Sequence, residues 1–350
     1  MNYSILVTGA SGFIGSFIVE EALKRGFEVW AGVRGTSSRK YLQDERIHFA
    51  QLDMQNPTKL RDQLLAYKAG MDGKGWDFVV HAAGATKCLH REDFFRTNTE
   101  GTKNLINALR ETEMIPQRFV FLSSLSIFGA IREEPVRKPS EDNPWVYSPI
   151  LLSDEPKPNT AYGESKLAAE HYLIAQKDFP YTILRPTGVY GPRERDYFLM
   201  AQSIKQHIDI AAGLTPQEIT FIYVLDVVQA IFKSMEAPKA EGKAYFLSDG
   251  KIYNSRSYSD LVQHCLGNPW VLHLKLPLCL LRAICWISGK ISRLTGKMNA
   301  LNDDKFNILS QRNWQCEIEP AIADFDFAPE WSLEEGVEAS INWYKKEGWL

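Results

Sequence analysis

Short apolar runs alternate with longer amphipathic stretches over the first half of the chain. Apolar runs of strand length lie at residues 5–7, 27–33, 47–52, 78–82 and 119–122, and helical periodicity lies at residues 17–24, 57–67, 91–111 and 160–177. Strands that alternate with helices indicate parallel strands joined by right-handed crossovers. Because the strands are almost continuously apolar, both faces of the sheet should be covered. The pattern predicts an α/β protein with a doubly wound parallel sheet.

A glycine-rich turn follows the first apolar run. It comprises Gly9, Ala10, Ser11, Gly12, Phe13, Ile14 and Gly15. A strand, a tight turn and a helix in this order aim backbone N–H groups and a helix N-terminus at one point, which suits a phosphate. The spacing is G-x-x-G-x-x-G rather than the G-x-G-x-x-G of the general dinucleotide fingerprint, so an ordinary glycine-rich turn is the alternative.

The second apolar run ends in Arg34, where an NAD-binding unit usually carries Asp or Glu for the adenosine ribose. Arg34, with Ser37, Ser38 and Arg39 behind it, offers positive charge and donors for a 2′-phosphate. This chemistry favours NADP over NAD, unless Arg34 and Arg39 are solvated loop charges. Three small residues follow the fourth run and would let backbone approach a flat ring: Ala82, Ala83 and Gly84.

Composition narrows the function classes. A chain of 350 residues with a formal net charge of −3 has no general attraction to nucleic acid. The five cysteines have no C-x-x-C spacing, and the seven histidines never fall at metal-ligand spacing, so we expect neither a disulfide framework nor a metal site. The first residues are strand-like rather than leader-like, and we expect a cytoplasmic protein.

Two further segments carry candidate chemistry. Ser123 and Ser124 end the fifth apolar run, where a serine is usually a cap or turn former. Residues 135–158 are rich in Pro, Ser, Asp and Glu and have no period, which predicts an exposed loop over the site. Tyr162 and Lys166 then lie four residues apart on one face of the predicted helix. A surface pair is the simpler alternative.

These segments together resemble the extended short-chain dehydrogenase/reductase family, the NAD(P)-dependent epimerase/dehydratase superfamily. The resemblance rests on the glycine turn, Ser123-Ser124 ahead of Gly129, Tyr162-x-x-x-Lys166, Leu184-Arg185-Pro186 to Val189-Tyr190-Gly191-Pro192, Phe221-Ile222-Tyr223-Val224-x-Asp226, and the tail from Trp343 to Leu350. The order and rough spacing match over nearly the whole chain. Within the family, the chain most resembles the 3β-hydroxysteroid dehydrogenase-like and dihydroflavonol reductase-like branches.

The resemblance implies a catalytic group of Ser124, Tyr162 and Lys166 beside a nicotinamide. Tyr162 would exchange a proton with the substrate oxygen, Ser124 would bind that oxygen, and Lys166 would hold the ribose hydroxyls. A phenol has a pKa near 10, so work near neutrality requires lowering it by about 3 units, or about 4 kcal/mol. An ammonium about 4 Å away supplies a comparable amount at an effective dielectric of about 20.

The resemblance also assigns supporting positions. Asp53 matches a residue that contacts the adenine amine, and the stretch from Pro186 to Val189 matches one near the carboxamide. Asn98 matches a position that steadies the helix or a water. The sugar-nucleotide members usually carry an Arg before the Tyr-Val-x-Asp strand to grip a pyrophosphate, and residues 214–223 contain none. Since threonine does not replace a bidentate guanidinium, a nucleotide sugar becomes a less favoured substrate.

Residues 276–297 form an amphipathic helical pattern that is too short and too charged to span a bilayer. Its apolar positions are Leu280, Ile284, Ile287, Ile291 and Leu294, and its charged positions are Arg282, Lys290, Arg293 and Lys297. Core packing, a lid over an apolar pocket, a dimer face and peripheral membrane contact are the alternatives.

We therefore expect a Rossmann domain at residues 1–185 with 221–249 added, and a smaller, mostly helical substrate domain at 186–220 and 250–330. A C-terminal helix and tail would occupy 331–350. The expected function is NAD(P)-dependent interconversion of a secondary alcohol and a ketone on a fairly apolar small molecule. The alternatives are a nucleotide-sugar epimerase or dehydratase that retains NAD, and a non-catalytic nucleotide-binding regulator. Family members often pair through two long helices, so we expect a homodimer.

Overall fold

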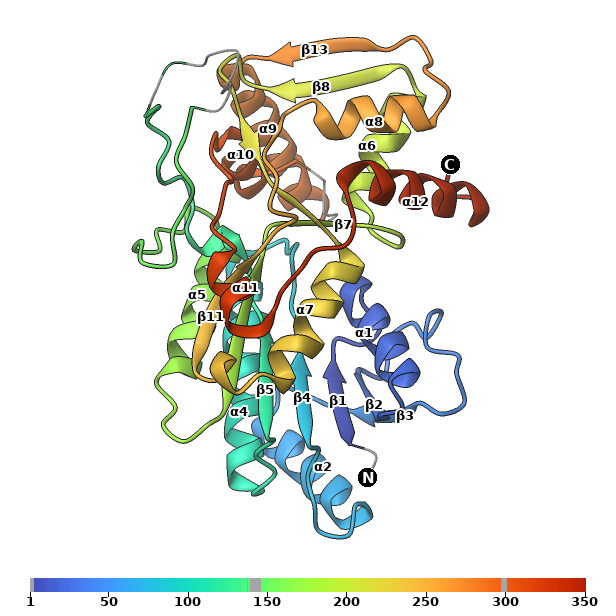
Figure 1. The fold of residues 1–350 in the computed structure, drawn as a ribbon, viewed down its shortest axis with the longest axis vertical. Coiled ribbons are helices and arrows are strands. Elements are labelled where there is room, and N and C mark those ends of the chain that lie inside the picture. Colours follow the sequence, from blue (N-terminus) through green and yellow to red (C-terminus); the bar gives the residue numbers. More distant parts are fainter. Residues whose placement is uncertain (1–2, 137, 139–145, 297–300) are drawn as a thin grey trace.

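A seven-stranded parallel sheet forms the centre of the molecule in the computed structural model, which describes residues 3–136, 138, 146–296 and 301–350 (Figure 1). The strands are β1 (Ser4–Thr8), β2 (Glu28–Val33), β3 (His48–Gln51), β4 (Phe78–His81), β5 (Arg118–Leu122), β6 (Tyr181–Pro186) and β11 (Lys243–Leu247), in the spatial order β11-β6-β5-β4-β1-β2-β3. This confirms the predicted doubly wound parallel sheet. The strand order changes direction between β1 and β4, so this is the topological switch point of the sheet. Sheets of this kind bind their ligands at that point.

Helices cover both faces of this sheet. One face carries α1 (Phe13–Lys24), α7 (Val224–Glu236) and α11 (Glu319–Phe325), and the other carries α2 (Pro57–Gly70), α4 (Gly101–Glu111) and α5 (Ala161–Ile174). Along β1, Ile5 and Val7 pack into the first layer and Leu6 into the second, and all three are fully buried. Double burial explains why the strands are apolar without alternation.

The helical pattern predicted at residues 91–111 is interrupted. It consists of α3 (Arg91–Phe94), a π-helical turn η1 (Phe95–Glu100) and then α4. A π-helical turn inserts one residue per turn and is common at functional sites. Periodicity alone does not reveal it, because the flanking turns keep their apolar positions.

The second part of the chain adds smaller elements at one end of the sheet (Figure 1). Its helices are α6 (Asp196–Lys205), α8 (Ser257–Cys265), α9 (Leu278–Thr295) and α10 (Asp303–Ser310). Three two-stranded sheets accompany them: β7 (Gly188–Tyr190) with β10 (Phe221–Tyr223), β9 (Glu218–Ile219) with β12 (Tyr253–Asn254), and β8 (Ile208–Ala212) with β13 (Leu272–Leu276). These strand pairs were not predicted, and the division into domains stays a prediction.

The last helix, α12 (Leu333–Lys346), packs against this second part. A reciprocal capping box between Ser332 and Glu335 begins it. The Tyr344 hydroxyl lies 3.1 Å from the carbonyl oxygen of Gly191 and 3.0 Å from that of Glu194. The end of the chain is therefore bound to the segment that follows the central sheet.

Parts of two predicted segments lie outside the described residues. The loop expected at 135–158 includes residues 137 and 139–145, and the helical pattern expected at 276–297 includes Lys297. Among the described residues, no helix is both long enough and apolar enough to cross a membrane.

Candidate active site

The glycine turn lies where the ends of β1 and β4 meet. Gly9 has a φ of +70°, and a Cβ there would lie 2.7 Å from the Cα of Ala83. A Cβ on Gly15 would lie 2.1 Å from the Gly9 carbonyl oxygen. Because both contacts are with backbone, only glycine fits at these positions. The structure thus brings the turn directly against the Ala82–Ala83–Gly84 segment, a contact that the sequence analysis did not predict.

The N-terminus of α1 points out of this turn. Gly12 is its N-cap, and no side chain within the described part of the chain caps the helix. The first backbone N–H groups, those of Phe13 and Ile14 with Ser11 just before them, are thus available to an anion. This geometry fits the pyrophosphate of a dinucleotide.

Arg34 and Asp53 lie on the β2–β3 side of the same cleft. Arg34 is exposed, and its backbone N–H donates to the Ser37 hydroxyl at 3.0 Å. The Asp53 carboxylate pairs with Lys59 at 3.1 Å. Arg39, by contrast, stacks its guanidinium 4.0 Å from the centre of the Phe49 ring. Both arginines are exposed, and of the two it is Arg39 whose guanidinium contacts an aromatic ring.

Ser124 and Tyr162 come together between β5 and α5. Ser124 caps a short 3-10 turn, η2 (Leu125–Ile127), and its hydroxyl accepts the Ser126 N–H at 3.1 Å. A hydrogen bond with Ser124 lowers the pKa of Tyr162, but burial raises it more, so the net pKa is raised. For Tyr162 to act as an acid and base near neutral pH, the sequence analysis required the pKa of its phenol to be lowered. The chain alone does not supply this, since desolvation of the phenolate outweighs the single hydrogen bond.

Gly163 explains how α5 comes so close to η2. A Cβ at this position would lie 2.4 Å from the Ser126 carbonyl oxygen. Any other residue would push the helix, and Tyr162 with it, away from Ser124. Sequence reasoning did not single out Gly163, although its place directly after the tyrosine was a usable signal.

Lys166 lies one turn further along α5 and is almost fully buried. Its ammonium nitrogen is 4.3 Å from the centre of the Phe121 ring, and no acceptor among the described residues hydrogen-bonds to it. Burial lowers the pKa of Lys166 to about 8, and the negative charge of Glu170 opposes this. A buried ammonium with free donors at the mouth of the cleft fits the hydroxyls of a ribose.

Glu170, one turn beyond Lys166, is fully buried and forms a bidentate ion pair with Arg185 of β6. The Nε–Oε1 distance is 3.1 Å and the Nη2–Oε2 distance is 2.6 Å. The pair joins the helix of Tyr162 and Lys166 to the strand that ends in Pro186. Sequence reasoning missed Glu170, although its spacing of four from Lys166 placed it on the same face.

Asn98 in the π-helical turn connects two parts of the site. Its side-chain amide accepts the Ala85 N–H at 2.7 Å and donates to the Ala85 carbonyl at 3.0 Å. It also donates to the Ser165 hydroxyl at 2.9 Å. Asn98 therefore fixes the segment after β4 against α5, in agreement with the positioning role expected for it.

Pro186 and Val189 lie where the chain leaves the central sheet at the end of β6. Pro186 is the buried last residue of β6, and Val189 in β7 is partly buried among the side chains that pack on α1. Their placement fits the predicted contact with the nicotinamide end of a dinucleotide.

A pocket of about 360 Å³ opens beside the N-terminal end of α5. It is lined by Ala161, by residues 87–92 and Phe94, by Gly289 and Ser292 of α9, and by residues 302–304. Its lysine and arginine are paired, Lys87 with Asp196 and Arg91 with Glu164. Asp303 and Asp304 add carboxylates. The lining therefore offers little attraction to a phosphate.

The strand that lacks the expected arginine carries a buried carboxylate instead. Glu218 accepts the Tyr147 N–H at 3.1 Å and also the N–H of Val146. The neighbouring Arg312 donates to backbone carbonyls, including those of Ala212 at 2.9 Å and Ser310 at 2.7 Å. Within the described residues, the Arg312 guanidinium therefore spends its donors on backbone carbonyls of the protein itself.

No cluster of His, Cys, Asp or Glu suited to a metal ion occurs in the described ranges. All five cysteines are free thiols.

Comparison with known proteins decides the family. Residues 5–254 match the model of the NAD dependent epimerase/dehydratase family. The chain belongs to this family. It is thus an enzyme of the extended short-chain dehydrogenase/reductase type, with a Rossmann-like sheet and an NAD-type cofactor, as the resemblance predicted.

Relatives within the family differ in reaction. The chain is 26% identical to a UDP-glucose 4-epimerase from Vibrio cholerae, over 85% of this chain and 87% of the relative. It is 26% identical to a 3-beta-hydroxysteroid dehydrogenase from Mycolicibacterium neoaurum, over 71% and 66%. A dTDP-glucose 4,6-dehydratase from Bacillus anthracis, solved with NAD, shares the fold with a TM-score of 0.74 at 18% identity, over 99% and 98%.

Proposed function

We propose that this family member is an NAD(P)-dependent oxidoreductase that interconverts a secondary alcohol and a ketone on a fairly apolar small molecule. The observation that carries the proposal is that Ser124 lies close enough to Tyr162 to lower its pKa, one helical turn from the buried ammonium of Lys166. A protein that only bound the nucleotide would not need this acid–base pair. The 3-beta-hydroxysteroid dehydrogenase relative supports this class of substrate.

In this proposal the nicotinamide, when bound, accepts or supplies the hydride. Ser124 orients the substrate oxygen. The Tyr162 phenolate takes the alcohol proton during oxidation, and the Tyr162 hydroxyl gives a proton to the carbonyl oxygen during reduction. Lys166 holds the ribose hydroxyls and keeps a positive charge near the phenol. Because burial raises the pKa of Tyr162 in the chain alone, the Lys166 charge and a bound oxidised nicotinamide would together have to stabilise the phenolate.

Tyr162→Phe tests the acid–base role. Removing a general acid–base group should lower kcat/KM by about 10²- to 10⁴-fold, with cofactor affinity little changed. Tyr172→Phe on the same helix is the matched control, since its hydroxyl bonds to Asn107 on the surface. The assay is nicotinamide absorbance with a panel of cyclic and aromatic secondary alcohols. Unchanged turnover in Tyr162→Phe would show that the proposed proton transfer is wrong.

The competing function is a nucleotide-sugar epimerase that retains NAD, as the Vibrio cholerae relative suggests. The lack of an unpaired cation in the pocket lining and the buried Glu218 weigh against it. Purified protein that carries tightly held, non-exchanging NAD and binds UDP at micromolar levels would favour the epimerase. Weak, freely exchanging cofactor would favour the oxidoreductase, which must release it every turnover.

We further propose that the cofactor is NADP, because Arg34 is exposed at the end of β2 with no acidic residue in its place. Arg34→Ala should weaken NADPH binding by about tenfold or more while leaving NADH binding unchanged, because one charge-assisted contact contributes about 1.5 kcal/mol or more. Arg39→Ala is the control, since Arg39 stacks on Phe49. Equal effects on the two cofactors would contradict the assignment.

A cytoplasmic homodimer is part of the same proposal. The free cysteines are compatible with a reducing compartment. Helices α4 and α5 lie on one face of the sheet, where the family resemblance places the pairing helices. Light scattering of the purified chain measures the oligomeric state directly.

A further inference from the structure

Helix α9 turns an apolar stripe toward solvent. The stripe consists of Leu280, Ile284, Ile287, Ile291 and Leu294, whose spacing of four and three residues places them on one side of the helix. All five are exposed, from 37% for Ile284 to 86% for Leu294. The side that packs against the molecule carries Leu281 and Cys285 instead. Core packing therefore does not account for the stripe.

The strand pair β8–β13, which leads into α9, has a second exposed apolar face. Leu272 pairs with Ile208 and Leu274 with Ile210, so all four side chains share one face, and all four are exposed. The opposite face carries Asp209, which lies 3.0 Å from His273 on β13 and accepts the Ser259 hydroxyl of α8 at 3.1 Å. The apolar face thus points away from the body, at the end of the molecule where α9 also lies (Figure 1).

Exposed large hydrophobic side chains are concentrated here. More than half of the large hydrophobic side chains that the described residues expose belong to residues 208–214 and 270–294. Scattered single residues of this kind are ordinary, whereas a contiguous group marks an interaction surface.

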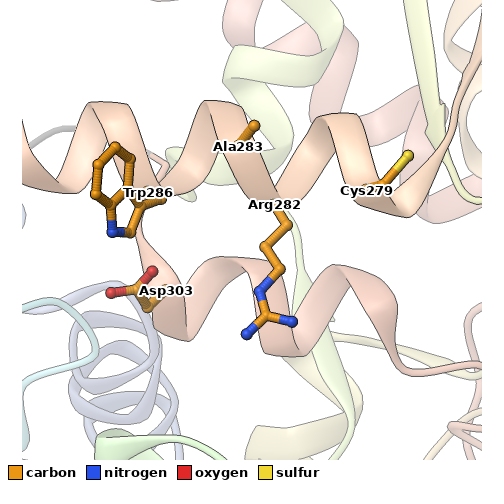
Figure 2. A pocket seen from close by; sticks show the side chains of 5 residues that line it. All are labelled: Cys279, Arg282, Ala283, Trp286 and Asp303. Carbon is orange, nitrogen blue, oxygen red and sulfur yellow. The ribbon is translucent and has the colours of Figure 1, made fainter.

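The charge of the same region is unlike that of the rest of the chain. Residues 261–302 contain five Lys or Arg and no Asp or Glu, whereas the whole chain has a formal net charge of −3. Lys275, Arg282 and Lys290 are exposed members of this set. Figure 2 shows Arg282 and Trp286 extending from α9 into a pocket that Asp303 of α10 also lines. Asp303 and Asp304 at the start of α10 are the acidic residues next to this region.

We propose that the α9 stripe and the apolar face of β8–β13 dock on a membrane surface that carries anionic phospholipids. Apolar side chains with a cation beside them, here Lys290, fit the boundary between headgroups and acyl chains. A second copy of this chain fits less well, because a twofold pairing would bring identical cations together. The 18 residues of α9, about 27 Å in length, would lie in the plane of the membrane. This surface is independent of the proposed reaction.

The proposal is tested by flotation of the full-length protein with vesicles of phosphatidylcholine alone and of phosphatidylcholine with phosphatidylglycerol. We expect binding to the anionic vesicles that weakens with added salt. Ile284→Ser with Ile287→Ser should weaken it by about tenfold per side chain. Lys290→Gln should weaken it by about fivefold, since each cation near an anionic surface contributes about that much.

Matched controls are Leu65→Ser and Ile115→Ser, which change similarly exposed side chains elsewhere. They should leave vesicle binding unchanged. Failure of the wild-type chain to bind anionic vesicles would overturn the proposal. Binding by the Ile284→Ser, Ile287→Ser stripe variant as strong as that of the wild type would also overturn it. Light scattering without lipid supplies a further check. A dimer that the stripe variant loses would assign this surface to a second copy and would also overturn the proposal.

Discussion

The buried ion pair between Glu170 and Arg185 allows a prediction that links stability to catalysis. Glu170 is fully buried and Arg185 nearly so, and two hydrogen bonds join them. Glu170→Gln removes the negative charge and leaves the guanidinium without a counter-ion in the interior. Removing one partner of a buried pair typically costs about 3–5 kcal/mol. Because the glutamine amide can still accept one hydrogen bond, we expect about 3 kcal/mol, a sizeable part of a typical folding free energy.

The same substitution acts on Lys166. The negative charge of Glu170 raises the pKa of this lysine, against the burial that brings it down to about 8. Without Glu170 the pKa should fall further, and Lys166 should lose its proton at a lower pH. The basic limb of the pH profile of kcat/KM should then move toward lower pH. A purely structural defect would lower activity without moving this limb.

Urea unfolding at several pH values measures the first effect, and steady-state kinetics over the same range measures the second. Glu164→Gln is the matched control, because Glu164 lies on the same helix and its ion pair with Arg91 is partly exposed. Exposed pairs contribute less than about 1 kcal/mol. Equal losses of stability in the two variants, or an unmoved basic limb in Glu170→Gln, would refute the reasoning.

Two other substitutions test single features. Burial raises the pKa of Asp226 to about 6, above its value in the unfolded chain. The folded state therefore binds this proton more tightly, which stabilises the fold at low pH. The stabilisation is lost as the pH rises through about 6. Relative to Asp226→Asn, the wild-type unfolding free energy should fall by about 3 kcal/mol between about pH 4 and pH 7, and parallel pH curves would contradict this. Gly15→Ala should cost more than about 2 kcal/mol and abolish cofactor binding, because its Cβ would lie 2.1 Å from the Gly9 carbonyl oxygen. Gly101→Ala, with its nearest neighbour at 3.7 Å, should be neutral or stabilising in the same unfolding and binding measurements.

Much of the fold was accessible from sequence, because each central strand is buried on both faces and flanked by turn residues. The strand predicted at 78–82 occupies Phe78–His81, and the glycine turn follows β1 (Ser4–Thr8) and leads into α1 as predicted. Local patterns also located Ser124 and Tyr162, since family motifs fix residues at the carboxyl ends of strands and at the start of a helix.

The remainder depended on contacts between residues far apart in the chain. The π-helical turn at Phe95–Glu100 accompanies the bonds of Asn98 to Ala85 and Ser165, which no periodicity contains. The pairing of β8 with β13 joins residues about 60 apart in the sequence. The raised pKa of Tyr162 depends on how deeply α5 is packed, and a motif carries no information about that burial.

The bond between Tyr344 and Gly191 has a consequence for the order of folding. These residues are separated by 153 positions, and ribosomes add about 5–20 residues per second. Synthesis of the chain from Gly191 to Tyr344 therefore takes about 8–30 s. During this time the segment after β6 cannot form its contact with α12. The cofactor-binding strands precede it and can pair much earlier. A nascent chain should thus acquire its nucleotide cleft first, while Tyr190 and its neighbours stay accessible to chaperones until the last helix emerges.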